Sequence, residues 1–301
     1  MSERTMDLTF TNWAADRGVL QGARHAAVRT AELNKDWTMA CYAFGIESSD
    51  IQQLHSSYKS LDVFPFNGRD LTHMGMHVAR CVFANHVHKG TNEQFNKEGL
   101  IIIEDFDVSS TYINKLNETD VGISKKHYNM FQGQIPGLRE LVEDCLGRSA
   151  TPYLEQNTFY QVIENIEDDN DEQKDYHCDT FFPALKFWYF PDDVDVEQGP
   201  FVYVKNSPVL TYEKLDWLYE QTCAVVDGTW EKERRRGHPE GSFRVTETEL
   251  FKMNLHACPV PVKAGTLVIG NVGGFHGRGS VSGSHTRRAI HGSVRVDNPF
   301  Q

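Results

Sequence analysis

The sequence predicts a mainly β fold, a barrel or jelly roll, with flanking helices and a helical region at its N-terminal end. Two observations predict it. From Thr158 onward, apolar and aromatic residues come in short strand-like runs separated by turn residues. Over residues 1–95, apolar residues recur instead at helical spacing, most clearly over 70–86.

The domain organisation follows from the same pattern. The sequence contains no internal repeat, no low-complexity linker and no break in composition that would mark a boundary. We therefore expect a single domain over 1–301. Residues 1–95 would support a β core over 99–297, and 211–258 would be an insertion in that core.

Individual elements follow from local signals. Gly99–Phe106 is a continuous Ile-rich run and predicts a buried strand. Capping residues over 107–111 predict a helix through about Leu116, and 137–146 is amphipathic up to Gly147. A further helix is expected over 211–222. The later strands are expected at 159–163, 184–190, 199–204, 267–269 and 286–296.

Composition narrows the class of protein. The formal net charge of −12 argues against nucleic acid or an anionic membrane as the main partner. The sequence has no apolar run of about 18 residues and no apolar leader, so we expect neither a transmembrane segment nor secretion. Its six cysteines form no C-x-x-C pair, which is typical of free thiols in a reducing compartment. We expect a cytoplasmic protein.

One short motif suggests a metal site. His177 and Asp179 are two residues apart, so on an extended chain both side chains lie on one face. The best third ligand is His276. Two imidazoles and one carboxylate on one face of a metal are typical of non-haem Fe(II) oxygenases. An isolated H-x-D is common, however, and also fits two ordinary polar residues at a strand end.

A downstream arginine makes the pattern more specific. Arg287 follows His276 by eleven residues, beyond a Gly/Ser-rich turn over 277–284. We expect a hairpin there, which would place Arg287 beside His276 on the neighbouring strand. A guanidinium near an open Fe(II) site can bind a carboxylate through two hydrogen bonds. The distal carboxylate of 2-oxoglutarate would be such a ligand.

The C-terminal half resembles the phytanoyl-CoA dioxygenase family of Fe(II)/2-oxoglutarate oxygenases. The resemblance covers roughly residues 155–297. The family usually has Gly-Ser-His after its G-P-F strand, where this chain has Asn206-Ser207-Pro208, so no role of that histidine carries over. The matching segments are His177-Cys178-Asp179, 186–193 (KFWYFPDD), 198–204 (QGPFVYV), 263–269 (KAGTLVI), 276–279 (HGRG) and 287–290 (RRAI).

The resemblance implies a double-stranded β-helix, of the jelly-roll or cupin-like kind, that binds Fe(II), 2-oxoglutarate and O2. His177, Asp179 and His276 would be the catalytic metal ligands, and Arg287 would bind the distal carboxylate of 2-oxoglutarate. Trp188 matches a family tryptophan that lines the cosubstrate. The implied reaction is hydroxylation of an unactivated C–H, with release of succinate and CO2. The carboxylate of Asp179 favours hydroxylation, desaturation or ring closure over halogenation.

Several residues have two interpretations. Gln161 is a cosubstrate-binding candidate from its position only. His291 shares a strand face with Arg287, so it would point inward or be a hydrogen-bonded core histidine. His73, His77 and Cys81 have the spacing of a zinc-binding helix face, but the same spacing is typical of ordinary helix packing, which we favour.

The substrate and the reaction class also leave alternatives. The charged segment 230–244, with arginines at 234–236, would lie over the site mouth or be a solvated turn. We expect a small polar metabolite or natural product as the substrate, an acidic one included, because Arg244, Arg278 and Arg288 could bind an anion. The rival functions are a non-redox metal enzyme of the cupin type and a metal-binding barrel without 2-oxoglutarate turnover. Fold alone does not choose between them.

Overall fold

The computed structural model describes residues 9–24, 27, 74, 90–119, 122–123, 127–131, 133–147, 149–150, 154, 157–167, 171–179, 184–229 and 243–295. The chain divides into two compact units. One comprises Met1–Lys89, Leu210–Phe243 and Asp297–Gln301, and the other comprises Gly90–Val209 and Arg244–Val296. Each unit is described by itself.

A polar cluster joins two helices of the first unit. They are α1 (Thr9–Asp16) and α10 (Tyr212–Val226), which begins where Thr211 caps it and runs beyond the expected end. Asp216 of α10 accepts hydrogen bonds from Trp13 Nε1 at 2.8 Å and from Arg17 Nη2 at 2.6 Å. Apart from Met74, the helix expected over 70–86 lies outside the described residues, as does His73-His77-Cys81.

The second unit is mainly β, with two sheets whose strands are antiparallel except for the β2–β4 pair. The larger sheet has the order β1-β10-β6-β12-β4-β2, with β3 also paired to β4. Its strands are β1 (Leu100–Ile103), β2 (Gly122–Ile123), β3 (His127–Met130), β4 (Thr158–Ile166), β6 (Ala184–Phe190), β10 (Thr266–Asn271) and β12 (Ser284–Arg295).

The smaller sheet has the order β8-β5-β11-β7-β9. Strand β8 lies within 211–258 and β9 begins at residue 257, so the end of the segment expected to be an insertion is part of the sheet. The number of domains stays a prediction. The strands are β5 (Tyr176–His177), β7 (Phe201–Val204), β8 (Arg244–Val245), β9 (Ala257–Val260) and β11 (His276–Arg278).

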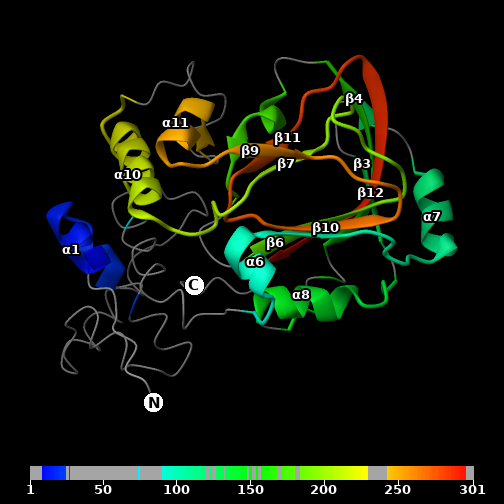
Figure 1. The fold of residues 1–301 in the computed structure, drawn as a ribbon, viewed down its shortest axis with the longest axis horizontal. Helices are drawn as coiled ribbons and strands as arrows, with labels where there is room; N and C mark the ends of the chain where they lie inside the picture. Colours follow the sequence, from blue (N-terminus) through cyan, green and yellow to red (C-terminus); the bar gives the residue numbers. More distant parts are fainter. Residues whose placement is uncertain are drawn as a thin grey trace. The chain divides into compact units, whose positions relative to one another are not determined.

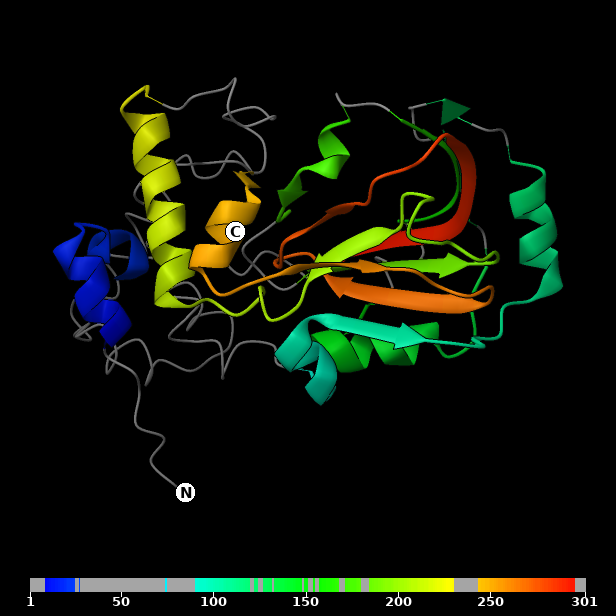
Figure 2. The same cartoon turned by 45° about the horizontal axis from the view of Figure 1, so that its top comes forward.

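Capped helices accompany the sheets, and α6 and α8 lie along one face of the larger sheet (Figures 1 and 2). Ser109 caps α7 and Gly147 ends α8 in the left-handed conformation, so both helices predicted here are confirmed. Thr246 and Glu249 form a capping box on α11. The helices are α6 (Glu93–Glu98), α7 (Ser110–Asn117), α8 (Leu138–Leu146), α11 (Glu247–Lys252) and the 3-10 turn η1 (Glu172–Lys174).

Alternation along each strand builds two apolar layers. Phe187 belongs to the outer layer, where the larger sheet packs against residues of α6, α7 and α8. Its neighbour Trp188 belongs to the inner layer, with Phe201 and Tyr203 of the smaller sheet. Because side chains alternate with period two, a single strand contributes to both layers. The functional side chains described below extend the inner layer.

The hairpin expected between His276 and Arg287 is wrong. His276 lies opposite both His177 and Tyr203, so β11 has a partner on each edge. The next strand, β12, therefore pairs in the other sheet with β4 and β6. The Gly/Ser-rich turn carries the chain from one sheet to the other. Arg287 approaches the site from the opposite wall rather than from a neighbouring strand.

The close packing of β12 against β6 gives a stability prediction. A Cβ at Gly292 would overlap the ring of its cross-strand partner Phe187. Gly292→Ala should lower the free energy of unfolding by about 1–3 kcal/mol because of overpacking, measured by urea denaturation. Adding Phe187→Leu should restore part of the loss. The control is Gly270→Ala, whose Cβ would lie at an ordinary 3.4 Å from Phe201. Equal effects of the two alanines would contradict this account.

Candidate metal centre

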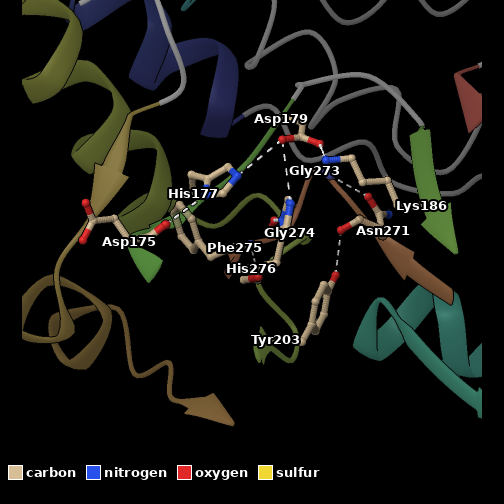
Figure 3. Close-up of polar contacts among 11 residues, drawn as sticks. Asp175, His177, Asp179, Lys186, Tyr203, Asn271, Gly273, Gly274, Phe275 and His276 are labelled. Carbon is tan, nitrogen blue, oxygen red and sulfur yellow. Dashed lines mark hydrogen bonds and ion pairs between the residues drawn. The ribbon is translucent and has the colours of Figure 1, made fainter. Parts of the chain in front are cut away.

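Three polar side chains from two distant parts of the sequence meet at one point (Figure 3). His177 ends β5, His276 begins β11, and the two face each other in the antiparallel register. Asp179 lies beyond the end of β5, where its N–H donates to the carbonyl of Val272 at 2.8 Å. Its Oδ1 is 3.6 Å from Nε2 of His177 and 3.7 Å from Nε2 of His276. The predicted ligands therefore lie together, with their ligand atoms within 4.8 Å of one another.

Backbone carbonyls determine which imidazole nitrogen faces the site. Nδ1 of His177 lies 2.8 Å from the carbonyl oxygen of Asp175, and Nδ1 of His276 lies 3.0 Å from that of Gly274. A carbonyl oxygen can only accept, so each Nδ1 carries the proton and each Nε2 presents a lone pair. Nε2 of His276 is buried and has no hydrogen-bond partner among the residues that the structure describes. A metal ion would satisfy that atom.

The ionisation states also suit a cation. Burial, with His276 and Arg244 nearby, lowers the pKa of His177 to about 3. Burial likewise lowers the pKa of His276. For Asp179 burial acts to raise the pKa, but His276, Lys186 and His177 outweigh it and hold the pKa below its usual value. At neutral pH the site offers two neutral imidazoles and one carboxylate. This donor set is consistent with the predicted Fe(II).

A cavity between the two sheets opens beside these residues. Its walls include the metal-site histidines and all three residues predicted to bind the cosubstrate, namely Arg287, Trp188 and Gln161. The aromatic rings of Phe190 and Phe201, from the inner layer, complete an apolar part of the wall. The cavity combines a metal-type donor set with a cationic side chain and an apolar surface.

Arg287 is a partly buried cation in this wall. Its Nη1 donates to the carbonyl of Gly199 at 2.6 Å, while its Nε is buried and has no hydrogen-bond partner among the described residues. In the described part of the chain no carboxylate forms an ion pair with it. Burial and the neighbouring Arg278 lower the pKa of Arg287 to about 9, partly opposed by Asp171. The guanidinium is still charged at neutral pH, and because no described carboxylate contacts it, an anionic ligand would be stabilised here.

The remaining cavity residues are held in definite orientations. The ring of Trp188 stacks on His291 at 5.0 Å between centroids, and Nδ1 of His291 lies 3.0 Å from the carbonyl oxygen of Phe187. Both interpretations of His291 therefore hold, since it points inward and has a hydrogen bond. Oε1 of Gln161 is buried and has no hydrogen-bond partner.

The other arginines differ in position. Arg278 lines the cavity and forms an ion pair with Asp171 at 2.8 Å. Arg288 lies on the other face of β12, where its guanidinium contacts both oxygens of Asp192 at 2.6 and 2.7 Å. Arg244 lies opposite His177 in the strand register. The arginines at 234–236 lie outside the described residues.

Sequence reasoning missed Lys186, whose ammonium forms an ion pair with Asp179 Oδ2 (Figure 3). Lys186 and Trp188 are two residues apart on β6 and both line the cavity. The expected strand over 184–190 already placed both on one face. From that shared face, Lys186 could have been predicted to line the site together with Trp188.

No family model and no curated protein matches this sequence. Among solved structures the chain is similar to AviO1 from Streptomyces viridochromogenes Tue57, with 13% identity and a TM-score of 0.41 over 68% of this chain and 93% of that one. It is similar to the non-heme alpha ketoglutarate dependent carbocyclase SnoK from nogalamycin biosynthesis, with 18% identity and a TM-score of 0.36 over 70% and 84%. It is also similar to EctD from S. alaskensis with 2-oxoglutarate and 5-hydroxyectoine, with 12% identity and a TM-score of 0.40 over 69% and 77%. Likenesses with TM-scores this low assign no function to this chain.

The donor geometry predicts metal-dependent stabilisation. Co(II), a stand-in for Fe(II), at 100 times its dissociation constant should raise the free energy of unfolding by about 2.7 kcal/mol, measured by thermal unfolding. Removing a residue that only orients a metal ligand weakens metal affinity by roughly 10–100-fold. His276→Ala removes a ligand itself, so it should weaken Co(II) affinity by more than that. The control is His285→Ala, because His285 is only half-buried, lies outside the cavity lining and bonds only Ser282 among the contacts described. Equal Co(II) affinity in the two variants would exclude His276 as a ligand.

Proposed function

We propose that this chain is an Fe(II)- and 2-oxoglutarate-dependent oxygenase on a single double-stranded β-helix domain, and a hydroxylase of a small polar or acidic substrate. One observation carries the proposal. The two imidazoles of the His177-Asp179-His276 cluster line a cavity together with Arg287, a partly buried guanidinium that has no carboxylate partner in the described part of the chain. A metal site alone would not need that cation.

The residues of the cavity would have separate roles. His177, Asp179 and His276 would hold Fe(II), which with 2-oxoglutarate and O2 supplies oxidative decarboxylation to succinate and CO2 and the oxidation of a substrate C–H. Arg287 would bind the distal carboxylate and set the direction in which the cosubstrate enters. Trp188 would line the cosubstrate, and the unpaired Oε1 of Gln161 faces the same space.

The cavity walls support this arrangement. Phe190 and Phe201 lie in the buried inner layer and line the cavity, so they would exclude water from the reacting atoms. Arg278 lines the same wall and would favour a substrate with a negative group, although Asp171 already balances its charge. No described helix is long and apolar enough to cross a bilayer. The cytoplasmic location stays a prediction.

The proposal predicts cosubstrate turnover. Purified protein with Fe(II), ascorbate and O2 should convert 2-oxoglutarate to succinate, slowly alone and faster with a substrate from a panel of polar and acidic metabolites, measured by mass spectrometry. A mass gain of one oxygen would identify the product of hydroxylation. His177→Ala should abolish both signals. Metal binding with no succinate above the His177→Ala background across the panel would favour the non-redox alternative.

Arg287 gives a test that needs no substrate. Arg287→Ala should weaken binding of 2-oxoglutarate to the Co(II)-loaded protein by at least about 30-fold, because it removes a buried charge pair worth about 2 kcal/mol or more. Isothermal titration calorimetry would measure this, and Co(II) affinity should change little. The matched control is Arg288→Ala, whose guanidinium binds Asp192 on the opposite face of the same strand. Unchanged 2-oxoglutarate affinity in Arg287→Ala would remove this residue from the cosubstrate site.

A further inference from the structure

The two oxygens of Asp179 have different neighbours. Oδ1 faces Nε2 of both His177 and His276, at 3.6 and 3.7 Å. Oδ2 contacts the ammonium of Lys186 instead (Figure 3). The side chain of Asp179 is 12% exposed and that of Lys186 is 20% exposed, so the pair is largely shielded from water. Screening is weak there, and the contact is stronger than an exposed ion pair would be.

Rigid parts of the fold hold both members of the pair. Lys186 is in the middle of β6, opposite Gly270 of β10 and Ser293 of β12. Pairing on both edges of β6 therefore fixes the backbone position from which the Lys186 side chain extends. The N–H of Asp179 is tied to the carbonyl of Val272 at 2.8 Å, just beyond the end of β10. The orientation of the carboxylate therefore depends on the larger sheet, whereas the two histidines belong to the smaller sheet.

We propose that Lys186 is a positioning residue that keeps Asp179 a one-oxygen ligand. A free carboxylate beside a divalent cation can bind it through one oxygen or through both. Chelation through both oxygens would fill one of the positions that two histidines and a single carboxylate oxygen leave open. By engaging Oδ2, Lys186 leaves Oδ1 for the metal and preserves that position. This inference rests on the metal site of the proposed function but not on 2-oxoglutarate turnover.

The charges of the cavity fit this role better than a role in binding an anion. Lys186 and Asp179 neutralise each other, and Arg278 and Asp171 do the same. Arg287 is the cationic side chain of the cavity wall for which no carboxylate partner is described. An incoming carboxylate would therefore bind Arg287 without displacing a partner, whereas binding to Lys186 would require that its contact with Asp179 be broken.

The test counts the exchangeable waters on a bound metal. Mn(II) is the probe, and the enhancement of water-proton relaxation per bound Mn(II) scales with the number of waters in its coordination shell. In a six-coordinate ion with three protein donors, losing one of the three waters lowers the signal by about one third. We expect Lys186→Met to show that loss at saturating Mn(II), and Lys186→Arg to restore the signal of the unchanged protein.

The matched control is Lys205→Met, which removes a lysine from an ion pair with Glu98 that lies outside the cavity lining. It should leave the relaxation signal unchanged. Thermal unfolding without metal checks that each variant is folded. If Lys186→Met does not fold, Lys186→Gln replaces it, and we expect a loss in the same direction. A folded Lys186→Met or Lys186→Gln variant with the full signal would overturn the proposal, as would one that no longer binds Mn(II).

Adding 2-oxoglutarate to the Mn(II)-loaded unchanged protein separates this inference from the proposed function. If the cosubstrate chelates the metal, it should displace two waters and lower the signal further. Absence of that fall would count against the proposed function alone. The difference between Lys186→Met and Lys186→Arg is measured before any cosubstrate is added, so it tests Lys186 by itself.

Discussion

The site depends on one cross-strand pairing, that of β11 with β5. It places His276 directly opposite His177, so two residues almost a hundred positions apart share one register. Carbonyl oxygens just before each strand, those of Asp175 and Gly274, then orient both rings, because each accepts a hydrogen bond from Nδ1 and leaves Nε2 facing inward. Without this pairing the carboxylate of Asp179 would have no second imidazole to approach. The pairing with Tyr203 on the other edge of β11 keeps the strand in place.

Burial determines both the ionisation states of the cavity residues and the free-energy cost of leaving the cavity empty. Neutral imidazoles tolerate a water-poor environment, and the lowered pKa of His177 reflects that. A guanidinium does not, and Arg287 is partly buried, with Nη1 bonded to Gly199 and with a buried Nε that has no hydrogen-bond partner among the described residues. Such a group destabilises the empty protein until an anion reaches it. The cost is consistent with a site organised around a ligand rather than around the core.

Strand β6 shows how the fold serves two purposes at once. Leu185, Phe187 and Tyr189 pack into the outer layer against the helices, whereas the alternate side chains Lys186 and Trp188 face the cavity. A substitution on one face therefore acts on packing, and one on the other face acts on the site. The same division applies to β12, where Arg287 lines the cavity and Arg288 binds Asp192 on the opposite face.

Local patterns in the sequence were sufficient for β1, β4, β6, β7, β10 and β12, for the caps of α7 and α8, and for the candidate residues at positions 177, 179, 276 and 287, because propensity, capping and ligand chemistry act over a few residues. They did not predict the strands β2, β3, β8 and β9. Sheet membership was not predictable in this way either. The turn after β11 has the composition of a hairpin turn, yet both edges of β11 are filled by β5 and β7. The Lys186–Asp179 contact also depended on long-range pairing, since the register of β6 with β10 and β12 places the lysine. The sequence determined which side chains could bind a metal and an anion, and the tertiary structure decided from which wall each one reaches the cavity.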